Sequence, residues 1–232
     1  MPGGSGAFYG GAVTGEIELH LPTGSGAYSG EQLTVLKDGH QAAVRLVRDV
    51  LQLDRLDVFA VDAPDMVIPS WGCGGCTYSA RSVVLAVDSS HPATMSAVRT
   101  TLVHEFHHVA RERGPGCGTS LRDRVVSEGL AMLFEEEILG AASEFAHQTI
   151  TDDQVGRMIE SLDEDPADDG RWCFHAGDMP LWLGYTVGYR WARSYAQACG
   201  LSAAALVNIS AKEVTAHSPA RSDELTRPDG RV

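Results

Sequence analysis

The feature that most restricts the fold is a pair of predicted helices joined by a short turn. Residues 96–111 carry apolar side chains at helical spacing and end at Gly114-Pro115-Gly116, a run that stops a helix. Residues 120–139 continue with a second helical pattern. Because few residues join them, the two helices are expected to pack together, and side chains from both can reach one site.

Three side chains of the first helix have a chemical reason for their spacing. His104 and His108 lie four residues apart, so both imidazoles leave the same helix face, one turn apart. This separation suits two ligands of one tetrahedral zinc ion. Glu105 points to the neighbouring side, where its carboxylate can take a proton from a water that zinc has acidified. The pattern also occurs by chance on many helices, so its context must decide.

A catalytic zinc needs a third protein ligand and one open position. Glu128 lies twenty residues after His108, on the second helix, and shares a face with Leu121, Val125 and Met132. A carboxylate on an apolar stripe is costly unless it is paired or binds a metal. We therefore expect Glu128 to be the third zinc ligand. The alternative is a surface glutamate beside the acidic run at residues 135–137.

The remaining histidines are not expected to bind metal. The pair Glu105 and His107 has no helical face in common with a set of zinc ligands, so we expect His107 to be a polar residue at the rim of the helix. Five others have no ligand-like spacing and are interpreted as ordinary: His20, His40, His91, His147 and His217.

Short apolar runs before the helical pair predict a small sheet. Residues 16–21 alternate polar and apolar side chains, and residues 56–61 and 81–87 are rich in strand-forming types. Between the last two lies Gly72-Cys73-Gly74-Gly75-Cys76, which we expect to be a glycine-rich turn. Residues 31–51 are expected to form an amphipathic helix that is interrupted or bent near Gly39.

The C-terminal part is predicted to be mostly helical, with helices at residues 182–199 and 201–210 after a loop at 163–170. The whole pattern predicts an α+β fold, in which a small mixed sheet packs on the helix of His104 beside a helical C-terminal part. The expected organisation is one domain, flanked by two tails. The domain is predicted at residues 16–215, a flexible Gly-rich tail at 1–15 and a polar tail at 216–232.

Charge and cysteine content restrict the partners and the location. The formal net charge of −13 argues against binding to nucleic acid. No run of about 18 apolar residues exists, so no membrane span is expected. Residues 1–15 do not resemble a secretory signal, and the five cysteines are an odd number. These features predict a cytoplasmic protein with reduced thiols. They do not determine the oligomeric state.

Three blocks of the sequence resemble one protein family. The first is residues 72–78 leading into 83–88, and the second is the helical pair with His104-Glu105-x-x-His108 and Glu128. The third comprises residues 172–174 and 180–190. The helical pair resembles the gluzincin metallopeptidases, the thermolysin-like clan. The other blocks narrow the resemblance to the small predicted zinc-dependent proteases catalogued as domain of unknown function 2268.

The resemblance implies a minimal gluzincin-like fold and a zinc metallopeptidase that cleaves peptide or protein substrates. In gluzincins an edge strand before the metal helix pairs with the substrate backbone. The matching segment is residues 81–87, with Arg81, Val83, Val84, Leu85 and Ala86 as the implied substrate-binding residues. The clan also uses a Tyr or His to stabilise the oxyanion. The implied donors are Tyr185 and Tyr189, with Arg190 and His175 behind them.

The sequence departs from the clan at the residue that orients the first histidine ligand. Thermolysin-like enzymes often carry an Asp four residues after the ligand Glu, and Met132 stands there in this chain. The orienting carboxylate must then come from elsewhere, such as Asp123 or Glu135, or a backbone carbonyl must replace it.

Three other functions remain open at this stage. A zinc-dependent amide or ester hydrolase that acts on a small molecule in a biosynthetic pathway would have a closed pocket. A non-catalytic zinc-binding regulator would have an occluded fourth zinc position. A redox or structural zinc protein would use Cys73 and Cys76, although the chain has no second paired cysteine motif and two ordinary thiols are expected.

Overall fold

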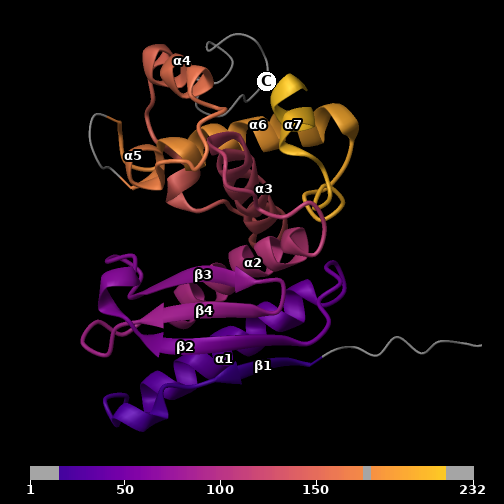
Figure 1. The fold of residues 1–232 in the computed structure, drawn as a ribbon. Coiled ribbons are helices and arrows are strands. Elements are labelled where there is room, and N and C mark those ends of the chain that lie inside the picture. The colour runs from indigo at the N-terminus through magenta and orange to yellow at the C-terminus, as the bar shows by residue number, and fades with distance from the viewer. Residues whose placement is uncertain (1–15, 175–178, 218–232) are drawn as a thin grey trace, which may run out of the picture.

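The computed structural model describes residues 16–174 and 179–217, and its sheet contains four strands. β1 (Ile17–His20), β2 (Leu56–Asp62), β3 (Cys73–Ser79) and β4 (Ser82–Val87) lie in the order β1-β2-β4-β3 (Figure 1). β1, β2 and β4 are parallel, whereas β3 runs antiparallel to β4. The sheet is therefore mixed, as predicted, and β1 and β3 are its edges.

Helices α1 (Gly30–Val47) and α2 (Met95–Glu112) cover one face of this sheet and pack against each other. Side chains of the central strands that face these helices are buried, namely Leu56, Val58, Ala60, Val83, Leu85 and Val87. Alternation along β2 leaves Phe59 on the opposite face, with 40% of its surface exposed. The helix that carries the predicted metal ligands, α2, thus rests directly on the sheet.

Helix α1 runs continuously through Gly39, so the predicted interruption is wrong. A capping box between Ser29 and Gln32 starts this helix. A Cβ atom at Gly39 would lie 2.6 Å from Cγ1 of Val98 on α2. The glycine therefore allows the two helices to pack closely and does not break α1.

The glycine-rich run that was predicted as a turn is mostly a strand. Gly72 makes the turn, with φ of +67°, and the following residues Cys73–Ser79 pair with β4. The prediction failed because glycines indicate turns in general, whereas here the small residues let β3 lie close to α2.

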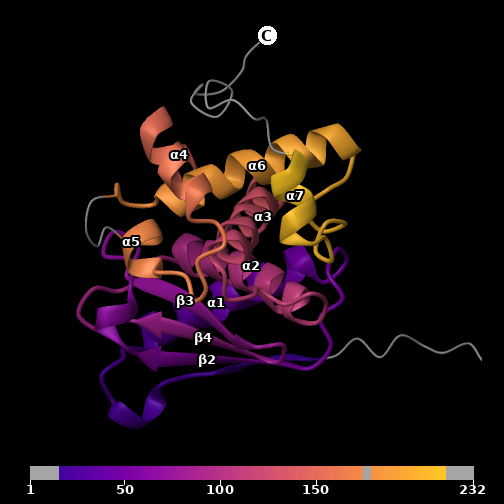
Figure 2. The ribbon, with the colours of Figure 1, turned by 45° about the horizontal axis from the view of Figure 1, so that its top comes forward.

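Beyond α2, the described residues form a helical layer. Its main members are α3 (Leu121–Leu139) and α6 (Leu183–Cys199), which pack against each other with α6 on the side away from the sheet (Figure 2). Shorter helices complete it: α4 (Asp152–Glu160), α5 (Asp169–Cys173) and α7 (Ala211–His217). Single 3-10 turns occur at Thr23–Ser25, Pro64–Met66 and Glu144–His147. The predicted α+β fold is confirmed.

Two smaller predictions in the C-terminal part need correction. The predicted loop at 163–170 ends early, because Asp168 caps α5 by accepting a hydrogen bond from the Arg171 amide. The helix predicted at residues 201–210 is absent: residues 203–208 form turns, and the next helix is α7. The predicted tails lie outside the described residues, except that residues 216 and 217 end α7.

The single-domain organisation stays a prediction. In the described part of the chain, no helix combines the length and the apolar character that crossing a membrane requires.

Candidate metal centre

Three predicted ligands converge on one point between α2 and α3. Nε2 of His104 lies 2.9 Å from Nε2 of His108 and 3.0 Å from Oε2 of Glu128. The third distance, from His108 Nε2 to Glu128 Oε2, is 3.4 Å. A tetrahedral zinc with bonds of about 2.0–2.1 Å holds its ligand atoms about 3.3 Å apart. These three atoms, here called the ligand triangle, therefore have the size of one face of a zinc coordination tetrahedron.

The packing of α3 determines where Glu128 lies. Glu128 directly precedes Gly129, which lies so close to the backbone of Gly188 on α6 that no Cβ could fit between them. The neighbouring turn of α3 is equally close, because a Cβ at Gly188 would meet the Val125 carbonyl oxygen. The crossing of α3 and α6 thus holds the backbone beside Glu128 in place.

Hydrogen bonds on the outer side of the imidazoles determine which nitrogen faces the triangle. His104 Nδ1 lies 2.6 Å from Oε1 of Glu135, and an ionised carboxylate can only accept. The ring proton of neutral His104 is therefore on Nδ1, and the lone pair of Nε2 points to the triangle. For His108, Nδ1 lies 3.1 Å from Ser127 Oγ and 3.8 Å from Cys117 Sγ. Of the two orienting carboxylates considered from sequence, Glu135 makes this contact, whereas Asp123 pairs with Ser120 at the start of α3.

The ligand triangle attracts positive charge. Burial alone would lower the pKa of His104, but hydrogen bonds to Glu128 and Glu135 outweigh burial and raise it to about 10. Burial would raise the pKa of Glu128, yet the two histidines hold it well below its usual range. Lone pairs and a carboxylate that converge in a buried space are unfavourable without a cation. The donor set of two imidazoles and one carboxylate therefore fits a zinc ion.

Glu105 lies on the same helix, between the two histidines, with its carboxylate directed to strand β3. Oγ1 of Thr77 donates to Oε2 of Glu105 at 2.8 Å. A Cβ at Gly75 would lie 2.6 Å from Oε1 of Glu105, so the carboxylate occupies the space that a side chain there would take. Sequence reasoning missed Thr77 and Gly75, because their role depends on β3 being a strand beside α2.

Of the two tyrosines predicted as oxyanion donors, Tyr185 lies near the triangle. Burial raises its pKa well above the usual value, and the charges of Glu128 and Glu105 add to this. Its ring contacts Phe145, Phe174 and Trp182, and its hydroxyl has no hydrogen-bond partner among the described residues. Its role as an oxyanion donor stays a prediction.

The contacts of Tyr189 and Arg190 are with groups other than the ligand triangle. The Tyr189 hydroxyl donates to Oε2 of Glu136 at 2.8 Å and accepts from Arg193. Arg190 donates to the backbone oxygen of Gln148 at 3.4 Å. His175 lies outside the described residues.

The expected edge position of residues 81–87 is wrong. β4 is a central strand that pairs with β2 on one side and with β3 on the other. Its backbone is not free for a substrate, and Val83, Leu85 and Ala86 are buried. The substrate-binding role inferred for Arg81, Val83, Val84, Leu85 and Ala86 thereby loses its basis. Sheet order is a long-range property that the local sequence does not carry.

His107 is not at the rim of the helix, as predicted, but fully buried. Its ring packs on Phe134, and Nε2 lies 3.3 Å from the Ala203 backbone oxygen. Burial lowers its pKa to about 3. His107 is therefore a neutral core residue that joins α2 to the turns after α6.

The two cysteines of β3 do not form a site together. They are three residues apart in a strand, so their side chains leave opposite faces. Cys73 is buried against Thr101 Oγ1, whereas Cys76 is exposed. Both are free thiols, which agrees with the expectation of two ordinary cysteines.

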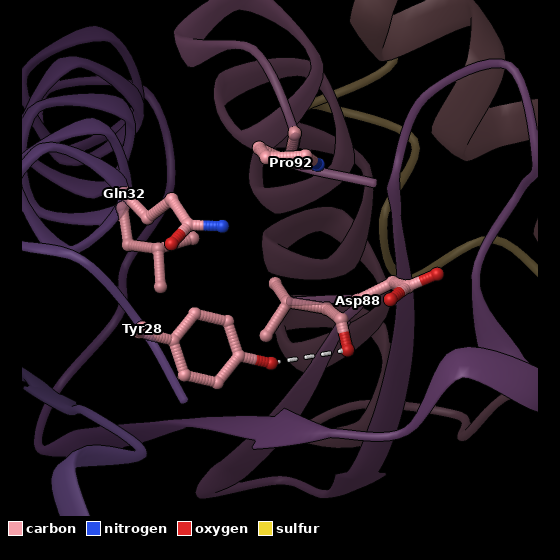
Figure 3. A pocket seen from close by; sticks show the side chains of 7 residues that line it. Tyr28, Gln32, Asp88 and Pro92 are labelled. Carbon is pink, nitrogen blue, oxygen red and sulfur yellow. Dashed lines mark hydrogen bonds between the residues drawn. The ribbon is translucent and has the colours of Figure 1, made fainter. Parts of the chain in front are cut away.

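The described residues form other grooves and clusters, which are weaker candidates for a functional site than the ligand triangle. A hollow beside Tyr28, Gln32, Asp88 and Pro92 has a volume of about 10 Å³, room for about one water (Figure 3). A wider groove of about 440 Å³ runs between β1 and α1, at the sheet edge opposite β3. A second group with metal-ligand spacing, Glu18, His20 and Asp57, includes two exposed residues. The ligand triangle is more buried than this second group.

A comparison with protein families found one match. The family described as predicted Zn-dependent protease, domain of unknown function 2268, matches residues 36–216. This range includes the sheet from β2 onward and all residues of the ligand triangle. Searches of curated proteins and of solved structures gave no significant match.

Proposed function

The chain belongs to the family of predicted Zn-dependent proteases catalogued as domain of unknown function 2268, and we propose that it is a zinc-dependent metallopeptidase. The observation that carries this proposal is the ligand triangle, with the buried carboxylate of Glu105 on the same helix. Three ligands from the protein leave one position of a tetrahedral ion for water or substrate.

An open position favours catalysis over a regulatory site. The side chains of His104 and Glu128 keep 14% and 15% exposure, and Gly75 beside Glu105 is exposed. The ligand triangle can therefore be reached from solvent. A regulator with an occluded fourth position would not need such access.

A zinc ion held by His104, His108 and Glu128 would supply a Lewis acid that polarises the scissile carbonyl and acidifies water. Glu105 would act as the general base that accepts the proton of the attacking water. The same carboxylate would then return this proton to the leaving amine nitrogen. Tyr185 would donate its hydroxyl hydrogen to the oxygen on which negative charge develops.

Strand β3 replaces residues 81–87 as the proposed binding site for the peptide backbone. β3 is a sheet edge next to α2 and carries Thr77 and Gly75 against Glu105. A peptide that adds to this edge as a further strand would pass beside Glu105. The free edge of β3 therefore supports the proposal of an extended peptide substrate.

The first prediction tests this function with zinc-loaded wild type and Glu105→Gln against a peptide library. Glu105→Gln should keep its zinc, because it does not touch the ligand atoms, and should cleave about 10²–10⁴-fold more slowly. Cleavage products are identified by mass spectrometry, and zinc content is measured in both proteins. Equal cleavage by the two proteins would contradict the proposal.

A further inference from the structure

Thr77 on the edge strand β3 contacts Glu105 at two points. Its Oγ1 lies 2.8 Å from Oε2 of Glu105 and 3.1 Å from the Glu105 backbone oxygen. A threonine hydroxyl has one hydrogen to donate, and both acceptors belong to the same residue. The hydroxyl therefore ties the proposed general base to β3.

The carboxylate is also confined on its other side. A Cβ at Gly75 would lie 2.6 Å from Oε1 of Glu105, and Gly75 and Thr77 face the same side of β3. Glu105 is 6% exposed, so its hydrogen bond from Thr77 is largely shielded from water. At 2.8 Å this hydrogen bond has an ordinary length, and little water can compete with Thr77 for the carboxylate. Small movements of β3 would therefore move the carboxylate.

We propose that Thr77 is a positioning residue that orients the Glu105 carboxylate for proton transfer and links this orientation to peptide binding along β3. The inference rests on the proposed function, because it assigns a role within that reaction. The strand that would pair with the substrate backbone is the one that holds the base. A peptide that aligns β3 would thereby align Glu105.

The second prediction concerns Thr77→Val, which keeps the shape and strand propensity of the residue and removes the hydroxyl. We expect kcat on a cleaved peptide to fall about ten- to hundredfold, because a misplaced base reacts slowly. KM and zinc content should stay unchanged. Thr77→Ser should restore kcat to within about threefold of wild type, because it restores the donor. A wild-type kcat in Thr77→Val, or no rescue by Ser, would overturn the inference.

Thr101→Val is the matched control. Thr101 lies one turn before Glu105 on α2, and its Oγ1 lies 3.5 Å from Sγ of Cys73 on β3. The substitution Thr101→Val removes a hydroxyl from the α2–β3 interface without touching Glu105, so kcat should remain that of wild type. An equal loss of kcat in Thr101→Val would mean that general damage to the α2–β3 interface causes the effect.

Adding Thr77→Val to Glu105→Gln tests whether Thr77 acts through Glu105. If it does, Thr77→Val should lower the residual rate of Glu105→Gln by less than about threefold. The inference would be overturned if Thr77→Val lowered this residual rate by as large a factor as it lowers the rate of the wild-type enzyme.

A measurement without zinc or substrate separates the failure of this inference from that of the proposed function. Urea unfolding of the metal-free wild type, Thr77→Val, Glu105→Ala and the double variant gives a coupling between the two residues. We expect their effects on the unfolding equilibrium to be non-additive by about tenfold. No coupling, together with an inactive Glu105→Gln, would overturn only the role of Thr77. Equal cleavage by wild type and Glu105→Gln would overturn the proposed function itself.

Discussion

Glu135 lies outside the ligand triangle, but its carboxylate determines the tautomer of the ligand His104. Its Oε1 accepts from Nδ1 of His104 at 2.6 Å, and its side chain is 3% exposed. With the proton held on Nδ1, Nε2 can give its lone pair to a metal. Glu135 replaces the carboxylate that is missing at Met132, from one turn further along the helix.

The third prediction is that Glu135→Gln lowers zinc affinity about ten- to hundredfold. A neutral amide is a weaker acceptor for the Nδ1 hydrogen, and its NH₂ group can reverse the tautomer of His104. Affinity is measured by competition with a chromophoric chelator. Glu136→Gln is the control, because that carboxylate bonds Tyr189 and should leave affinity unchanged. The same loss in both variants would argue against the role of Glu135.

At the residue scale, helical spacing was enough to predict that His104 and His108 share one face of α2. Glu128 comes from α3, and the packing of α3 on α2 brings its carboxylate to the two histidines. Glu135 was one of several alternatives, since choosing it requires the crossing of α2 and α3. Thr77 could not be found, because its contact with Glu105 joins two elements whose packing no local pattern encodes.

At the scale of elements, the positions of the strands in the sequence were predicted better than their order in the sheet. The strands at 56–61 and 81–87 were recognised from their β-branched residues, and the structure has them as β2 and β4. β3 was mistaken for a turn, and this error made β4 look like the edge next to α2. A single missed strand thus moved the expected substrate site by one position in the sheet.

The crossing of α3 and α6 brings two backbones together directly beside Glu128. The fourth prediction is that Gly129→Ala costs about 3 kcal/mol or more, because the new Cβ would meet the Gly188 backbone, which cannot move aside as a side chain can. Thermal unfolding should occur about 6–12 °C lower. Zinc affinity should fall as well, since Glu128 is the adjacent residue.

Gly156→Ala in α4 is the control for this substitution. Apart from the chain neighbours and the helix's own backbone, no atom lies within 4 Å of a Cβ at Gly156. The same change should therefore stabilise the chain by about 0.5–1 kcal/mol through helix propensity. Both unfolding free energies are measured in urea at one pH. A Gly129→Ala variant as stable as Gly156→Ala would show that the helices can separate without cost.

At the scale of the whole molecule, the ligand triangle lies at the junction of two layers. The sheet with α1 and α2 forms one layer, and α3 to α7 form the other (Figures 1 and 2). His104 and His108 come from α2, whereas Glu128 comes from α3. A bound zinc ion would therefore link the two layers, in addition to any catalytic role.

The fifth prediction follows from this position of the site. A ligand that binds only the folded chain stabilises it by about 2.7 kcal/mol at a free concentration of one hundred times its Kd. For a chain of this length, removal of zinc by a chelator should lower the midpoint of thermal unfolding by about 5–10 °C. The shift should be small in Glu128→Gln, which loses the only ligand that α3 contributes to the triangle. A scan with and without chelator in both proteins measures this. If the chelator shifts both equally, the metal that stabilises the fold lies elsewhere, and the group Glu18, His20 and Asp57 would be the next to test.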